Sequence, residues 1–451
     1  MTANIQKKII YLPLIGLHIS IISRTIILMI CFLIHGEIFA QKLFPSKDIV
    51  SKIWIETGKN NNRIFVPHIK TVQLYHAETP MSYPVLNING ESVLTLHFDD
   101  IDSVDHYYTY SIEQYDANWE IQNNDPFSFL EGFNNNPIND YQISGATSIS
   151  YKHYTLNIPN DDLKITKSGN YLIKVYETSP QNPILTCRFS LYENKLTTFA
   201  DLKMSHLGSM RNNTHKIRML LNINQVQVSD IFSDIKIMVL TNNIWATAKT
   251  DIKPLFVRDN QIEYEIELNP HNEFRTLNLK ELSQNYSDVT EKTTIKGIDH
   301  IKLPVDNFRV YTDHKHKNDM NGRNFIEKYN AWDANIDADY FHAYFTLNTD
   351  QPLLDGNIYI YGALSHYSLN PWNLMVYNAD KKAYENSMLL KQGFHDYYYV
   401  HVNSANLDID FDRIEGNAAQ TSNDYLIYVY IRDHFTGTDN LWGFNVVTSF
   451  P

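Results

Sequence analysis

Short segments in which apolar and polar residues alternate recur along most of the chain, with polar turns between them. Leu94, Leu96 and Phe98 share one face of such a segment, which is the period of two that is typical of a strand with one buried face. The pattern predicts further strands at residues 108–112, 154–158, 171–176, 216–228, 235–240, 262–268, 340–347, 358–362, 397–402 and 425–432. No segment has the pattern of a helix of three or more turns. The sequence therefore predicts an all-β protein built from antiparallel sandwiches.

The first forty residues have the pattern of a secretory signal peptide. Two lysines, Lys7 and Lys8, precede apolar residues 9–22, and Arg24 precedes a second apolar block at 25–34. Neither block reaches the roughly 18 apolar residues that a membrane span needs. We expect residues 1–40 to be a signal peptide that is cleaved after Ala40, so that the protein is exported. The alternative is an uncleaved membrane anchor.

The remaining length predicts several domains in tandem. Removing 40 of the 451 residues leaves 411, and at about 100–200 residues per domain this length corresponds to two to four domains. We place a first sandwich at residues 41–195, a second at 196–305 and a C-terminal sandwich at 306–451. The expected architecture is a row of immunoglobulin-like or early-set β-sandwiches after the signal peptide.

The net charge limits the classes of binding partner, and the cysteine content limits the disulfides that the chain can form. The formal net charge is −13, which argues against nucleic acid and against anionic lipid as the binding partner. Of the two cysteines, Cys31 would leave with the signal peptide, so Cys187 could form no intramolecular disulfide. We expect Cys187 to be a small buried apolar residue. The 30 tyrosines fit amphipathic sheet faces, or in part a recognition surface.

Candidate metal ligands lack the spacing that would make a site specific. His314 and His316 flank a lysine, but no third ligand is near, so we interpret them as part of a solvated loop. The aspartates at 99, 100 and 102 lack the glycine and terminal glutamate of a calcium loop, and we expect them to cap a turn. The pairs His395-Asp396 and Asp105-His106 are expected at the surface. We predict no metal site and no cofactor.

Motifs of enzymes are also missing from the sequence. There is no G-x-S-x-G elbow and no glycine-rich phosphate loop that opens a helix. A chain without a nominated nucleophile, metal or cofactor motif is more typical of a binding or structural protein than of an enzyme. We therefore expect no catalytic residues, with an uncharacterised hydrolase as a remote alternative.

A polar insertion interrupts the first predicted domain between Gly132 and Tyr141. Long loops inside a compact β-domain are uncommon unless they are functional or disordered. We therefore predict a partner-binding loop formed by Asn134, Asn135, Asn136, Asn139 and Asp140.

Several strings, in a consistent order, resemble one known family. In the first domain they include Asp116-Ala117-Asn118-Trp119 and also residues 94–100, 110–113, 131–133, 138–141, 144, 151–154, 158–160 and 168–171. In the C-terminal part they are residues 358–362, 384–385, 389–393, 414–417, 421, 423–425 and 430–432. Together they resemble the Bacteroidetes type IX secretion system plug protein, over nearly all of the mature chain. The family tends to have a cysteine where Gln114-Tyr115 stand here.

The resemblance implies a non-catalytic role in protein transport. The plug of this family sits at the periplasmic mouth of the large outer-membrane translocon barrel that exports type IX cargo, and it keeps that pore shut. The resemblance thus implies a periplasmic protein that is associated with the outer membrane through its partner and is not itself inserted.

The C-terminal domain also resembles early-set modules related to glycogen-binding domains, from residues 359–363 through Pro371-Trp372-Asn373 and Met375. Exposed tryptophans of carbohydrate binders stack on sugar rings, and Trp372 is the candidate for such stacking. Our preferred interpretation is that Trp372 is a core or loop-anchoring residue, because a fold analogy does not establish ligand binding. The alternative function is that of a periplasmic carbohydrate-binding protein.

Overall fold

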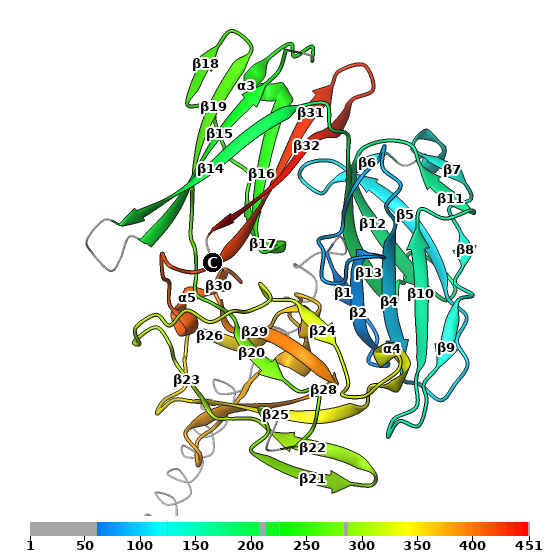
Figure 1. Cartoon of the computed structure of the whole chain (residues 1–451), viewed down its shortest axis with the longest axis vertical. Helices are drawn as coiled ribbons and strands as arrows, with labels where there is room; N and C mark the ends of the chain where they lie inside the picture. The colour runs from blue at the N-terminus through cyan, green and yellow to red at the C-terminus, as the bar shows by residue number, and fades with distance from the viewer. Residues whose placement is uncertain (1–60, 124, 207–212, 225, 284–286, 450–451) are drawn as a thin grey trace, which may run out of the picture.

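Three β-sandwiches make up the computed structural model of the protein, which describes residues 61–123, 125–206, 213–224, 226–283 and 287–449 (Figure 1). The predicted all-β class is confirmed. The expected signal peptide at residues 1–40, its cleavage after Ala40, the membrane-anchor alternative and Cys31 lie outside the described residues. Within the part of the chain that is described, no helix is both long and apolar enough to cross a membrane.

The first sandwich packs a seven-stranded sheet against a four-stranded one. The larger sheet has the order β1-β13-β12-β5-β6, with β3 paired to β13 and β8 paired to β5. The smaller sheet has the order β2-β4-β10-β9, and β7 pairs with β11 separately. The elements are β1 (Arg63–Ile64), β2 (Ile69–His76), β3 (Val85–Asn87), β4 (Leu94–Asp100), β5 (Thr109–Tyr115), β6 (Ile121–Asn123), η1 (Pro126–Ser128), β7 (Leu130–Gly132), β8 (Asn136–Pro137), β9 (Tyr141–Ile143), β10 (Lys152–Ile158), β11 (Leu163–Ile165), β12 (Gly169–Tyr176) and β13 (Leu185–Tyr192).

The second sandwich combines strands from the middle of the chain with its last two strands. One sheet has the order β14-β15-β19-β18 and the other the order β17-β16-β31-β32. The elements are β14 (Thr197–His206), β15 (Asn213–Asn222), α3 (Ile231–Asp234), β16 (Ile235–Thr241), β17 (Ile244–Lys249), β18 (Phe256–Arg258), β19 (Gln261–Leu268), β31 (Asn423–Asp433) and β32 (Thr438–Ser449). Figure 1 shows the red strands β31 and β32 beside the green strands.

The third sandwich lies in sequence between β19 and β31. Its first sheet has the order β20-β29-β24, with β26 and β30 also paired to β29, and its second the order β21-β22-β25-β28-β27, with β23 paired to β25. The elements are β20 (Arg275–Asn278), β21 (Glu291–Ile295), β22 (Ile298–Lys302), β23 (Asp306–Asn307), β24 (Asn324–Ile326), α4 (Ala334–Asp337), β25 (Tyr340–Asn348), β26 (Gly356–Tyr361), η2 (Ala363–Ser365), η3 (Pro371–Asn373), β27 (Val376–Asn378), β28 (Ala383–Lys391), β29 (Gly393–Asn403), β30 (Ile409–Asp410) and α5 (Asp412–Glu415).

The sheets do not follow the linear division at residues 196–305 and 306–451. Strand β31 pairs with β16, so the end of the predicted C-terminal domain completes the second sandwich. One face of β31 carries Tyr425 and Ile427 into the core of that sandwich. Its other face carries Leu426 and Tyr428 into a cluster that includes Val85 of the first sandwich. Strand β31 is therefore buried on both faces, because the core of its own sandwich covers one face and the first sandwich covers the other.

Candidate functional site: buried polar contacts at the junctions

A buried carboxylate connects the first sandwich to the third. Asp99, in β4, is fully buried, and its Oδ1 lies 2.7 Å from His153 Nδ1 in β10. Its Oδ2 accepts hydrogen bonds from Lys391 Nζ and Tyr340 Oη, both at 2.6 Å. Burial alone would raise the pKa of Asp99, but the Lys391 ammonium and His153 hold it below its usual range. The result is a buried ion pair that spans two sandwiches.

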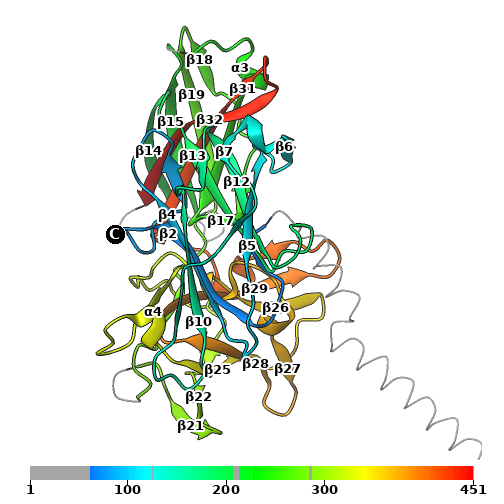
Figure 2. The ribbon, with the colours of Figure 1, turned by 90° about the vertical axis from the view of Figure 1, so that its right-hand side faces the viewer.

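Further hydrogen bonds near Asp99 also connect the first sandwich to the third. Tyr151 donates to the carbonyl of Ala338 at 2.9 Å, and Lys391 donates to the carbonyl of Asn335 at 2.6 Å. These two carbonyls belong to α4 and the residue after it, which Figures 1 and 2 both place beside the first sandwich. Trp372, in η3, is half-buried and packs against the core of the first sandwich, with Lys70 Nζ 5.8 Å from its ring centroid. Trp372 thus lies at the junction between two sandwiches.

An arginine that contacts two tryptophan rings marks the junction of the first and second sandwiches. The Arg188 guanidinium carbon lies 3.9 Å from the ring centroid of Trp119 and 4.6 Å from that of Trp245. Burial lowers the pKa of Arg188 to about 9. Nearby, Tyr430 of β31 donates to Asn170 Oδ1 of β12 at 2.9 Å. The cation–π contacts hold β17 against the first sandwich, and the hydrogen bond of Tyr430 holds β31 against it.

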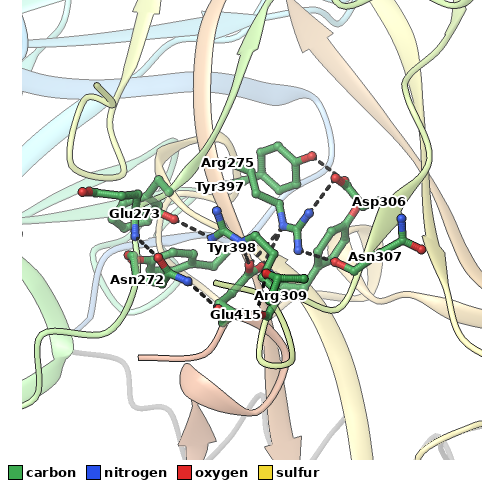
Figure 3. Close-up of polar contacts among 12 residues, drawn as sticks. Asn272, Glu273, Arg275, Asp306, Asn307, Arg309, Tyr397, Tyr398 and Glu415 are labelled. Atoms are coloured by element: carbon green, nitrogen blue, oxygen red, sulfur yellow. Dashed lines mark hydrogen bonds and ion pairs between the residues drawn. The ribbon is translucent and has the colours of Figure 1, made fainter. Parts of the chain in front are cut away.

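A second buried carboxylate organises the interior of the third sandwich (Figure 3). Glu415 is fully buried at the end of α5, and it accepts from Arg275 Nε at 2.9 Å and from Arg309 Nε at 2.6 Å. Arg275 also donates to Asp306 Oδ1 at 2.6 Å. Burial opposes ionisation of Glu415, but the two guanidinium groups lower its pKa overall. This network joins α5 to β20 and β23 through charged hydrogen bonds.

Three acidic side chains, Glu273, Asp319 and Asp396, lie close together in the same part of the molecule. Burial, together with the Asp319 carboxylate, raises the pKa of Asp396 to about 7 and that of Glu273 to about 6. His314 Nε2 and His316 Nδ1 approach Glu273 Oε1 at 3.6 and 3.2 Å. The loop that we expected to be solvated therefore turns both imidazoles toward a buried carboxylate.

The raised pKa of Asp396 predicts a measurable pH dependence of stability. The folded protein holds this proton up to about pH 7, whereas the unfolded chain releases it near 3.8. The associated stabilisation is therefore complete below about pH 4 and is lost as the pH rises to about 7. We expect Asp396→Asn to flatten the decline in unfolding free energy over this window by a few kcal/mol, at about 1.4 kcal/mol per pKa unit. Urea unfolding at several pH values measures this, and an unchanged slope would contradict it.

Several polar residues that we expected at the surface are buried. Asp99 and Asp100 belong to β4 and are 0% and 1% exposed, so the expectation that they are solvated is wrong. Asp100 and Asp102 do cap the turn after β4, because they accept hydrogen bonds from the backbone nitrogens of Asp102 and Val104. His395 and Asp396 are 2% and 0% exposed, so their predicted surface position is also wrong. Alternation alone could not show this, because polar partners from distant segments cover these side chains.

The polar insertion at residues 132–141 is in part a strand. Asn136 is buried in β8, which pairs with β5, and Asn134 bonds both the backbone nitrogen and the carbonyl of Ile112, at 2.7 and 2.9 Å. Asn135 accepts a hydrogen bond from Tyr176 at 2.8 Å. Of the five predicted residues, Asn134, Asn135 and Asn136 are therefore held by hydrogen bonds or strand pairing within the first sandwich. The other two, Asn139 and Asp140, are exposed.

One buried Asp–His pair among the described residues, Asp99 and His153, invites comparison with catalytic machinery. Asp99 and His153 are placed like the Asp–His half of a hydrolytic triad, but the other ring nitrogen of His153 lies 3.0 Å from His97 Nδ1, where a triad has a hydroxyl or thiol. Cys187 is buried, and burial raises its pKa, so the thiolate is disfavoured. Among the described residues, one group of three side chains has metal-ligating atoms close together: His68, Asp100 and His106.

Comparison with known proteins gives two matches. A sequence model of the family described as "Type 9 secretion system plug protein 1st domain" matches residues 69–193, which is nearly all of the first sandwich. A crystal structure of a hypothetical protein from Parabacteroides merdae has 30% sequence identity and a TM-score of 0.81, and the alignment covers 86% of this chain and 99% of that one. A search of the curated proteins found no match.

Proposed function

Because this chain belongs to the type IX secretion system plug protein family, we propose that it is a non-catalytic plug that binds and seals the outer-membrane translocon pore of this system from the periplasmic side. The proposal includes export by a cleaved signal peptide. It also includes association with the outer membrane through the translocon barrel, without insertion of the chain itself.

The buried Asp99–Lys391 ion pair is the observation that supports a plug most directly. A stopper for a pore that passes folded proteins must be large and must resist deformation. This buried ion pair favours one arrangement of the first and third sandwiches, because a shifted packing that kept either charge buried without its partner would cost several kcal/mol. The chain therefore has the bulk and the internal rigidity that a plug requires.

Co-purification from detergent-solubilised envelopes tests this function. We expect the tagged protein to bring down a very large outer-membrane barrel at a fixed ratio, and we expect deletion of its gene to raise outer-membrane permeability to large antibiotics. Permeability that stays at the wild-type level in a strain that retains the barrel would count against sealing. Recovery of the tagged protein without any envelope partner would count against docking.

The exposed pair Asn139 and Asp140 gives a prediction about the docking surface. Lysine at both positions should reduce co-purification of the barrel at least about tenfold, since charge mismatches at an interface cost several kcal/mol, while the melting temperature stays within about 1 °C of wild type.

Asn134→Ala is the matched control from the same segment. This change removes two hydrogen bonds to the backbone of Ile112, so it should lower the unfolding free energy by about 1–3 kcal/mol and leave docking of the folded protein intact. A loss of stability in the lysine variant with binding intact would show that Asn139 and Asp140 are structural residues.

The carbohydrate-binding alternative gains no support from the position of Trp372. This side chain packs against the first sandwich, and Lys70 lies over its ring, whereas a sugar-stacking platform requires an open face.

A further inference from the structure

Three side chains with metal-ligating atoms meet at one end of the first sandwich. His68 directly precedes β2, Asp100 ends β4, and His106 lies in the segment that leads to β5. One ligand atom from each residue lies within 4.8 Å of those of the other two. Zinc bonds to nitrogen and oxygen are about 2.0–2.2 Å long, so small side-chain rotations would bring these atoms around one ion.

The imidazole of His68 lacks the hydrogen bond that a buried ring nitrogen normally makes. Its Nε2 is buried and has no partner, and its ring stacks on that of His106 with 4.9 Å between the centroids and 6° between the planes. A buried polar atom without a partner costs about 1–3 kcal/mol. Such an atom calls for an unseen ligand or another physical explanation, and a bound cation would satisfy it.

Two further carboxylates approach His106 in the arrangement of a metal-ligating histidine. Its Nδ1 lies 3.2 Å from Glu177 Oε1, and its Nε2 lies 3.4 Å from Asp102 Oδ2. The second separation is long for a hydrogen bond but is about the distance between two ligand atoms of a tetrahedral zinc ion. Glu177 is placed to orient the imidazole through its other nitrogen, as carboxylates do behind metal-bound histidines.

Hydrogen bonds also hold the carboxylate of Asp100 in place. It is 1% exposed, with Oδ2 accepting from Tyr108 Oη at 2.9 Å and Oδ1 accepting from the Asp102 backbone nitrogen at 2.9 Å. Each carboxylate oxygen has a second lone pair, so these bonds leave acceptor capacity for a cation. A negative charge at this depth is stabilised by a nearby positive ion.

We propose that His68, Asp100 and His106 bind one divalent cation of the zinc class, with Asp102 as the fourth ligand and Glu177 behind His106. Two imidazoles with carboxylates favour zinc, cobalt or nickel, since calcium and magnesium prefer oxygen ligands alone. The ion would tie the segment between β4 and β5, which carries the exposed side chains of Val104 and Tyr107, to the start of β2. Asp100, Asp102 and His106 lie in one short segment, but His68 and Glu177 come from distant segments, so spacing along the sequence did not reveal the whole set.

Calorimetric titration of the chelator-treated full chain with ZnCl₂ tests the site, with the protein carrying no polyhistidine tag. We expect one zinc ion per chain and a zinc-dependent rise in melting temperature. His68→Ala should weaken binding at least about 100-fold, and Glu177→Gln should weaken it about 10–100-fold. Cobalt(II) should give the visible absorption of a tetrahedral site in the wild type and lose it in His68→Ala.

A second stacked histidine pair supplies the matched control. His300 and His342 stack with 4.8 Å between centroids and 18° between planes, but they belong to no group of three ligands in the described part of the chain. His342→Ala should therefore bind zinc like the wild type. Absence of stoichiometric binding, or equal affinity in the wild type and both His68→Ala and Glu177→Gln, overturns the proposal. Glu177 is 42% exposed, so its variant keeps the test valid if His68→Ala fails to fold.

Discussion

Asp99→Asn should lower the free energy of unfolding by about 3–5 kcal/mol and divide thermal unfolding into separate transitions. The asparagine amide would leave the Lys391 ammonium, itself 1% exposed, without its counter-charge, and it would offer one acceptor where the carboxylate serves three donors. Because these donors come from both the first and the third sandwich, the loss should uncouple the two bodies. Differential scanning calorimetry measures both effects.

Asp350→Asn is the matched control for this change. Asp350 is 89% exposed and pairs with Lys382 at 3.6 Å, so removing its charge should change stability by no more than about 1 kcal/mol. The contribution of Asp99 should also depend on pH in a defined direction. Its pKa is lowered in the folded state, so the stabilisation is present above about pH 4 and is lost as the pH falls further. A single transition at the wild-type temperature in Asp99→Asn would show that this ion pair does not couple the sandwiches.

Glu415→Gln should destabilise the third sandwich by a similar amount, about 3–5 kcal/mol. The amide would leave Arg275 and Arg309 facing each other without the charge between them, and Arg275 would keep only Asp306 as an acidic partner. The pKa of Glu415 is lowered by both arginines, so the difference from wild type should be greatest above about pH 4.5 and should shrink as the pH falls. Urea unfolding at several pH values measures this difference.

Glu265→Gln provides the corresponding surface control. Glu265 is 47% exposed and lies 3.3 Å from Lys216, so its neutralisation should cost no more than about 1 kcal/mol. If the two glutamine variants were equally stable, the buried network around Glu415 would contribute no more than an exposed ion pair.

The sequence correctly predicted features that depend only on which side chains of a short segment are buried. Alternation at residues 94–98 and 262–268 located β4 and β19, because a strand places every second side chain on one face. It failed at Asp99 and Asp396, which it placed in water. A charged residue beside an apolar run faces either water or a partner, and the partner of Asp99 lies 292 positions away, in Lys391. The apolar residues 388–390 directly before Lys391 indicated that this charge lies next to a buried segment.

The sequence by itself determined the all-β class, the positions of many of the longer strands and the family, since all three depend on patterns within short segments of the chain. Only the tertiary structure decided that β31 completes the second sandwich, that Asp99 meets Lys391 and that His68 lies beside His106. Backbone hydrogen bonds are alike along every strand edge, so local pattern cannot choose a distant partner. The choice depends on how whole faces fit together, and that is a property of the packed molecule.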